Sequence, residues 1–372
     1  MSNPIDRLDR YDGYLQQDPD NTSLAVEAFE LALTLGLHER AEGYLDQAQA
    51  AAGEDPYLQY RRASLRAAQG RWAEALASQA ELCRRFPQDP DLRAAFAGLL
   101  HYAGKYDEAE AVWSQFEGIG DLPDHAWANR LRTLHFTGRL EAALSAGEGD
   151  AGTLERNPEA AGVLSLIAID SGQFEAARRW SAVALASLPD SPEALTAAGA
   201  LALAAKDASG AMSTLTRVVQ QRPREGRAWS SLGIAHLLTQ DGAAAAADFQ
   251  RATMLMPAHI GSWHGLGWAG LLLGNVAQAR AAFEQALALD RNFGESHGAV
   301  AVAYALENRG ADAARHIELA LRLDPAALST RFAQAVLAGA LRRPEEFQAM
   351  ADRALRGVEA PDGRSLIDWI KQ

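Results

Sequence analysis

The sequence has almost no cysteine and no surplus of positive charge. Cys83 is the one cysteine in 372 residues, which excludes an internal disulfide framework and a cysteine-rich zinc site. Acidic residues outnumber basic ones by 48 to 35, and the formal net charge is -13. Because nucleic-acid binding needs clustered positive charge, we expect no nucleic-acid partner. A protein partner is expected to be neutral or basic.

Long apolar runs are also missing. No uninterrupted apolar stretch approaches the roughly 20 residues that are needed to cross a bilayer. The N-terminus moves directly into a charged segment and lacks the apolar stretch of a signal peptide. We therefore expect a cytoplasmic protein without membrane insertion. The composition is rich in alanine and poor in lysine, which is typical of a GC-rich bacterial genome but does not bear on function.

A repeat of 34 residues runs through the chain. Counting Gly226 as position 1 places Trp229 at position 4, Gly233 at 8, Ala245 at 20 and Phe249 at 24. The copy that starts at residue 260 has matching residues at these last four positions, namely Trp263, Gly267, Ala279 and Phe283. Steps of 34 residues then give ten starts without an insertion, at 22, 56, 90, 124, 158, 192, 226, 260, 294 and 328.

Two positions test this register. Position 20 is alanine in every repeat except the last, where Phe347 stands. Position 15 is glycine in six repeats, at Gly36, Gly70, Gly104, Gly138, Gly172 and Gly274. Glycine at this place is typical of the left-handed residue that ends a helix. Small residues at positions 8 and 20 let two antiparallel helices pack closely, so each repeat is predicted to be a helical hairpin.

This signature resembles the tetratricopeptide repeat family over nearly the whole chain. The resemblance implies an all-α fold, a right-handed α-solenoid of ten helical hairpins with a capping helix at both ends. We expect an N-terminal capping helix within residues 1–21, with its helical part at residues 4–17. Repeats 1 to 4 are assigned to residues 22–157, repeats 5 to 10 to 158–361, and a C-terminal capping helix to 362–372.

Glycines weaken the second helices of repeats 3 and 4. Each interior glycine costs about 1 kcal/mol relative to alanine in a helix. The glycines in question are Gly118, Gly120, Gly147, Gly149 and Gly152. Residues 145–157 are therefore predicted to form either a hinge between two halves of the chain or a short helix followed by an ordinary loop.

No motif indicates catalysis. Gly265, Gly267 and Gly270 match the spacing of a dinucleotide-binding fingerprint, but they fall in the middle of a predicted helix with no strand before it. The nine histidines are spread over different repeats without the spacing of metal ligands. We expect no enzyme activity, no cofactor and no metal.

The main binding surface is predicted in the C-terminal repeats. In the tetratricopeptide family the first helices line a concave groove, and positions 2, 5, 6, 9, 12 and 13 face into it. Such positions carry the predicted partner-binding residues Ile234, Leu238, His264, Trp268, Leu272, Val302, Leu306 and Val336. An exposed apolar stripe anchored by Trp268 suits a partner's amphipathic helix or extended apolar segment. The alternative is that these side chains pack inside a tightly wound array.

A secondary site is predicted in the N-terminal repeats, where groove positions are polar and aromatic. Its residues are Tyr57, Tyr60, Arg61, Tyr102, Asn129, Arg132 and Phe136. This mixture of side chains predicts an acidic or peptide-like ligand.

The resemblance implies a scaffold for protein–protein interaction that does not itself catalyse a reaction. We expect an adaptor or a chaperone-like assembly factor that binds a protein or peptide segment in its concave groove. An alternative is a recognition subunit that recruits substrate to a separately encoded enzyme. Self-association through a groove or a terminal helix is a third interpretation.

Overall fold

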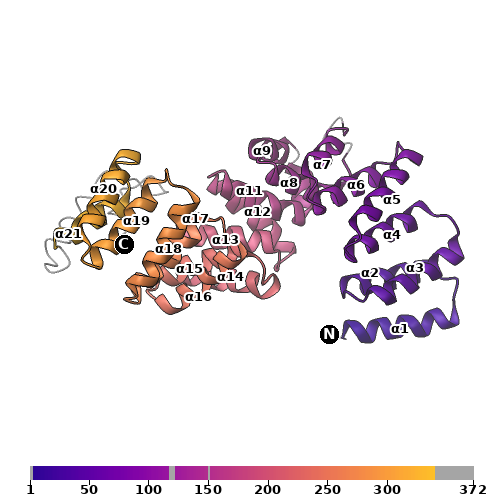
Figure 1. The fold of residues 1–372 in the computed structure, drawn as a ribbon. Coiled ribbons are helices and arrows are strands. Elements are labelled where there is room, and N and C mark those ends of the chain that lie inside the picture. The colour runs from indigo at the N-terminus through magenta and orange to yellow at the C-terminus, as the bar shows by residue number, and fades with distance from the viewer. Residues whose placement is uncertain (1–2, 117–121, 150, 340–372) are drawn as a thin grey trace. The chain divides into compact units, whose positions relative to one another are not determined.

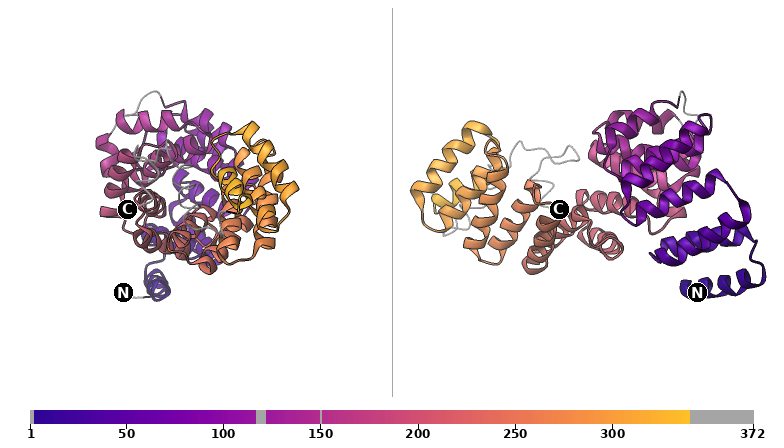
Figure 2. Two further views of the ribbon diagram at one scale, coloured as in Figure 1. Left: turned by 90° about the vertical axis from the view of Figure 1, so that its left-hand side faces the viewer. Right: turned by 45° about the vertical axis from the view of Figure 1, so that its right-hand side comes forward.

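The computed structural model describes residues 3–116, 122–149 and 151–339 (Figure 1). Within these residues every regular element is helical, and consecutive helices pack as antiparallel pairs. The two further views in Figure 2 show the same pairwise layering. The fold is an all-α solenoid of helical hairpins, as the sequence predicts.

Contacts between Cα atoms divide the chain into two compact units. Unit 1 contains residues 1–173 and 182–188, and unit 2 contains residues 174–181 and those from 189 onward. Residues 145–157 lie inside unit 1, and their role as a hinge stays a prediction.

Unit 1 begins with the lone helix α1 (Pro4–Gln17), which occupies the range predicted for the N-terminal cap. The hairpins follow in chain order: α2 (Thr22–Thr34), α3 (His38–Ala52), α4 (Pro56–Ala68), α5 (Trp72–Arg85), α6 (Pro90–Tyr102), α7 (Tyr106–Trp113), the 3-10 helix η2 (Asp124–Ala126), α8 (Trp127–Phe136), α9 (Leu140–Gly149), α10 (Ala151–Arg156) and α11 (Pro158–Asp170).

Helix α12 (Phe174–Ser187) contains residues of both units. The helices of unit 2 follow it: α13 (Pro192–Ala204), α14 (Ala208–Gln221), α15 (Gly226–Leu238), α16 (Gly242–Leu255), α17 (Ile260–Leu272), α18 (Val276–Leu289), α19 (Gly294–Leu306), α20 (Gly310–Leu323) and α21 (Leu328–Leu337). The predicted second helix of repeat 10 and the predicted C-terminal cap fall among residues 340–372, outside the described residues.

The turn inside each hairpin has one conformation in all nine repeats whose position 15 is described. The six glycines at this position have φ between +70° and +78°, which confirms the prediction of a left-handed helix end. Three repeats place a residue with a side chain in the same conformation, with φ of 58° at Lys206, 59° at Gln240 and 60° at Asn308. The turn geometry is therefore kept even where glycine is absent.

Small residues determine how closely the helices approach. The alanines at position 20 are fully buried in all nine repeats that carry one. In α17, a β-carbon added to Gly265 would collide with the ring of Phe249, and one added to Gly267 would collide with the ring of Phe283. The glycine-rich run of α17 is thus explained by packing against two aromatic rings, and the dinucleotide interpretation is excluded.

A buried glycine also explains part of the glycine-rich stretch in repeat 4. A β-carbon at Gly147 would collide with Leu164 on α11, so glycine lets α9 and α11 approach each other. Helix α9 continues through Gly147 to Gly149, and α10 contains Gly152. The helix is therefore not interrupted at Gly147. The glycines at 118 and 120, which are predicted to weaken the second helix of repeat 3, lie outside the described residues.

The N-terminal helix covers the first hairpin. Leu8, Tyr11 and Leu15 of α1 are buried in one cluster with Phe29 of α2 and Leu45 of α3. This burial removes the apolar outer side of the first hairpin from water, as a neighbouring helix does within a repeat array. No helix within the described part of the chain is long and apolar enough to cross a membrane.

Candidate protein-binding grooves

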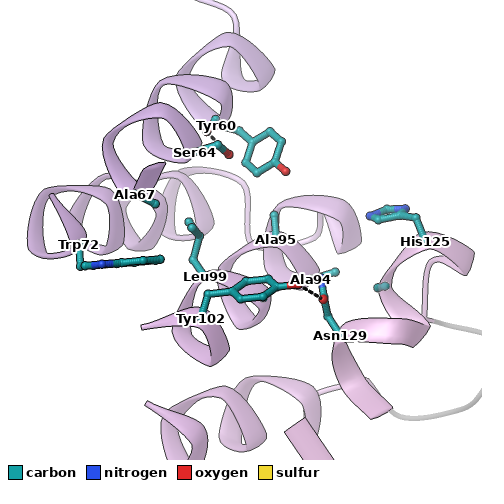
Figure 3. A pocket seen from close by; sticks show the side chains of 12 residues that line it. Tyr60, Ser64, Ala67, Trp72, Ala94, Ala95, Leu99, Tyr102, His125 and Asn129 are labelled. Carbon is teal, nitrogen blue, oxygen red and sulfur yellow. Dashed lines mark hydrogen bonds between the residues drawn. The ribbon is translucent and has the colours of Figure 1, made fainter. Parts of the chain in front are cut away.

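A groove of about 280 Å³ lies in unit 1 among α4, α6, η2 and α8 (Figure 3). The floor of the groove is recessed because α6 has small residues, namely Ala94, Ala95 and Gly98, at three positions that face the groove. A β-carbon at Gly98 would lie 3.1 Å from Asn129 Nδ2, so even a small side chain there reaches the opposite wall. The remaining lining residues are Tyr60, Ser64, Ala67, Trp72, Leu99, Tyr102, His125, Ala126 and Asn129.

One side-chain amide on α8 is held in a fixed orientation. The hydroxyl of Tyr102 donates to Asn129 Oδ1 at 3.1 Å, as Figure 3 shows, and Arg132 Nη1 donates to the same oxygen at 3.2 Å. A guanidinium can only donate, so the acceptor atom of this amide must be the one beside Arg132. Asn129 Nδ2 therefore faces Gly98 and the groove, and it has no hydrogen-bond partner within the described part of the chain.

The positive charges around this groove are paired. Arg132 Nη1 lies 2.9 Å from Glu159 Oε1, and Arg61 Nε lies 2.9 Å from Glu30 Oε1. These pairs leave little net positive charge to attract an acidic ligand, so they favour the peptide-like ligand of the two that the sequence predicts.

A buried polar cluster supports the groove wall behind Asn129. The hydroxyl of Thr133 lies 3.2 Å from His101 Nδ1, accepts from Trp113 Nε1 at 3.0 Å and donates to the carbonyl of Asn129 at 2.9 Å. Burial, with a smaller effect from the charge of Arg132, lowers the pKa of His101 to about 4. The imidazole is therefore neutral at pH 7, and the wall carries no charge there.

The structure brings three of the predicted secondary-site residues into this groove, namely Tyr60, Tyr102 and Asn129. Tyr57 lies outside the lining, and its hydroxyl donates to Asp89 Oδ2 at 3.0 Å. Phe136 also lies outside it, against Tyr106. The sequence-based assignment did not include Ser64, Trp72 and Gly98, which also line the hollow. The groove-facing positions of Ser64 and Gly98 in the repeat were the available signal.

The predicted stripe of unit 2 is exposed over only part of its length. Ile234 and Leu238 of α15 and Leu272 of α17 are 43%, 44% and 46% exposed. These three side chains form the accessible part of the stripe.

The rest of the predicted stripe packs inside unit 2. Val302 is fully buried, so the prediction that it faces a partner is wrong, and His264 is only 8% exposed. Val302 belongs to a core cluster against which Leu306 and Trp268 pack. Nε2 of His264 lies 2.8 Å from Oγ of Ser296, and burial lowers the pKa of His264 to about 4. Val336 is half-buried on α21.

Close packing of α19 and α21 accounts for this difference. A β-carbon at Gly298 would lie 2.5 Å from the backbone nitrogen of Thr330, so glycine lets the two helices meet. Phe332 of α21 then reaches Trp268, with the ring centroids 5.9 Å apart, while Phe283 contacts the same indole at 5.4 Å. Trp268 is a half-buried packing residue between these two rings, as the structural alternative predicted.

Within the described residues, no group of three or more histidine, cysteine, aspartate or glutamate side chains is arranged to hold a metal ion.

The fold is that of a helical-hairpin repeat protein. Its helices pack as antiparallel pairs, each turn has a left-handed residue, and alanines are buried at a fixed position of the repeat. Models of the tetratricopeptide repeat match residues 26–90 and 260–293. The chain therefore contains tetratricopeptide repeats in both units.

Solved structures with this fold include a crystal structure of the APC/C hetero-tetramer Cut9–Hcn1. It has a TM-score of 0.56 and 14% identity, and the match covers 91% of this chain and 82% of that chain. TTC0263, a tetratricopeptide protein of Thermus thermophilus, has a TM-score of 0.40 and 24% identity, with 50% of this chain and 99% of that chain covered. MamA has a TM-score of 0.39 and 22% identity, with 42% and 92% covered. No curated protein matches the sequence.

Proposed function

We propose that this chain is a non-catalytic adaptor that holds an extended segment of a partner protein in the groove of unit 1. Membership of the tetratricopeptide family supports a protein–protein interaction scaffold. The proposed location of the partner segment rests on Asn129, whose Nδ2 faces a hollow that Gly98 keeps open.

The groove has the chemistry for a main chain with an uncharged side chain. A backbone carbonyl of the partner accepts a hydrogen bond from Asn129 Nδ2, and that contact is independent of the partner's sequence. Tyr60, Trp72 and Tyr102 supply aromatic surface for one apolar side chain. The floor is made of small apolar residues, so seating an uncharged segment buries no unpaired charge.

The exposed part of the unit 2 stripe is a second contact surface in this proposal. Ile234, Leu238 and Leu272 are apolar and accessible, which suits a further apolar segment of the same partner.

Selection of random short peptides displayed on phage tests the groove directly. Peptides enriched on the full wild-type chain should lose binding to Gly98→Leu, because the new side chain fills the hollow, and to Asn129→Leu, which lacks the donor. Gly43→Leu is the matched control, because a β-carbon at Gly43 has no neighbour within 4 Å and it lies on α3, away from the groove.

Thermal melts of all three variants separate loss of binding from loss of folding. Equal binding of the selected peptides to wild type and both groove variants would place their site elsewhere and overturn the proposal. If Gly98→Leu fails to fold, Asn129→Leu still decides the outcome, because it removes the Nδ2 donor, together with the acceptor of Tyr102 and Arg132, and keeps a similar volume.

A further inference from the structure

Four aromatic side chains line the turn edge of unit 1, and we call them the aromatic rim: Trp72, Tyr102, Tyr106 and Phe136. Tyr102 and Phe136 are the last residues of α6 and α8, and Trp72 and Tyr106 are the first residues of α5 and α7. Phe136 is 63% exposed and Tyr102 is 56% exposed. A folded chain rarely leaves grouped aromatic rings in water, so such a patch marks an interaction surface.

The ring of Phe136 is fixed by its neighbours. It stacks on Tyr106 with ring centroids 5.0 Å apart and an interplanar angle of 17°, and the buried ring of His101 lies edge-on at 5.3 Å. These contacts hold the phenyl ring in place while much of its surface remains accessible. A rigid, exposed aromatic face is suited to stacking with a planar group.

A hollow of about 320 Å³ lies beside this stacked pair. Its other lining residues are Gly104, Lys105, Asp107, Glu108 and Thr137. Lys105 Nζ is paired with Glu108 Oε1 at 2.7 Å, which neutralises both charges. The carboxylate of Asp107 has no ion-pair or side-chain hydrogen-bond partner in the described part of the chain, so the hollow has one unpaired carboxylate next to two aromatic rings.

We propose that this hollow binds an arginine side chain of the partner, with the guanidinium lying on the rim at Phe136 and paired with Asp107. A cation is attracted to the negative face of an aromatic ring and to a nearby carboxylate. Arginine is the fitting cation, because its planar, weakly hydrated guanidinium stacks on a ring and offers two parallel donors to a carboxylate. The chain's net charge of -13 favours the approach of such a basic segment.

This inference rests on the proposed function, since it names one side chain of the protein partner. It adds a specificity that the uncharged groove at Gly98 does not supply. Lysine fits less well, because its ammonium is compact and strongly hydrated.

Calorimetric titration with defined peptides tests the arginine site on the full chain. The probes are glycine-serine peptides with arginines at regular spacing, and matched peptides with lysine or with citrulline, which keeps the planar shape of arginine but is uncharged. The arginine peptide should bind most tightly. Phe136→Leu and Asp107→Asn should each weaken it by about three- to tenfold, the range expected for a cation–aromatic contact or a single ion pair.

Tyr14→Leu is the control, because Tyr14 is 55% exposed on α1 and lies outside the rim. Equal affinity for the arginine and lysine peptides, or unchanged arginine binding in both rim variants, would overturn the site. Gly98→Leu distinguishes the two proposals, because it fills the groove, whereas Phe136 and Asp107 line a different hollow. If the Gly98→Leu variant still prefers the arginine peptide, the arginine site at the rim is supported, whatever the display selection shows. If the variant loses this preference, the contact lies in the groove and the proposed rim site is overturned.

Discussion

The two units are built from the same 34-residue repeat, yet their groove-facing positions have different roles. In unit 1, small residues on α6 create an open groove between polar and aromatic walls. In unit 2, small residues on α19 let α21 approach until Trp268, Val302 and Phe332 pack together. A small residue at such a position can therefore open a binding surface or close it, depending on whether a neighbouring helix moves into the space.

Replacing Trp268 with alanine should give the largest effect on stability. The indole contacts the rings of Phe283 and Phe332, so its loss leaves a cavity and should lower the free energy of unfolding by about 2 to 4 kcal/mol. The matched change in unit 1, Tyr102→Ala, removes an exposed ring and should cost within about 1 kcal/mol. Urea denaturation of both variants makes the comparison, and equal losses would show that the two positions do not differ in role.

Gly267→Ala should also destabilise unit 2, by about 1 to 3 kcal/mol, because the new methyl group collides with the ring of Phe283. Gly43→Ala is its control in unit 1. Alanine at this position has open space and a better helix propensity, so it should stabilise by up to about 1 kcal/mol. Thermal melting shows whether each substitution raises or lowers the stability. A stabilising Gly267→Ala would mean that α17 and α18 do not pack as closely as the structure has them.

Acid should weaken both units through buried histidines. Burial lowers the pKa of His264 in unit 2 and of His101 in unit 1 from 6.5 to about 4. The unfolded chain thus binds protons that the folded chain excludes, so stability is full above pH 6.5 and falls as the pH drops toward 4. The loss is on the order of 1 kcal/mol per pH unit for each histidine in this window.

Urea midpoints measured across this pH range test that linkage. His264→Gln should reduce the slope while the contribution of His101 remains. An unchanged slope in that variant would show that His264 titrates at its ordinary pKa in the folded chain.

The smallest expected effect concerns the hairpin turns. Gln240 of unit 2 has φ of 59°, which strains a residue with a side chain, so Gln240→Gly should raise stability by about 0.5 to 1 kcal/mol. Gly138→Ala in unit 1 is the reverse change at the same repeat position and should lower stability by a similar amount. If both substitutions shift the melting temperature in the same direction, the shared turn geometry is contradicted.

The sequence predicted the hairpins and their turns because these depend on local properties. The left-handed turn at Gly36 and the small residue at Ala245 are requirements within one repeat, so periodicity is enough to find them. The helix limits of α1 followed from the same register. Such features need no knowledge of how distant helices pack.

The binding surface was harder to predict, because exposure depends on contacts between repeats. Val302 occupies a groove-facing position by register, but the approach of α21 buries it. Gly98 carries no chemistry that a residue-by-residue search would select, yet its missing side chain opens the unit 1 groove. Both outcomes depend on interhelical distances that are not encoded in any one repeat.

In the proposed function, unit 1 holds the partner segment. Amide hydrogen exchange of the full chain, with and without a display-selected peptide at saturation, tests it most directly. We expect slower exchange in α4, α6 and α8, where the groove residues lie. Protection confined to α15 and α17, with unit 1 unchanged, would contradict this claim and assign binding to the exposed stripe at Ile234, Leu238 and Leu272.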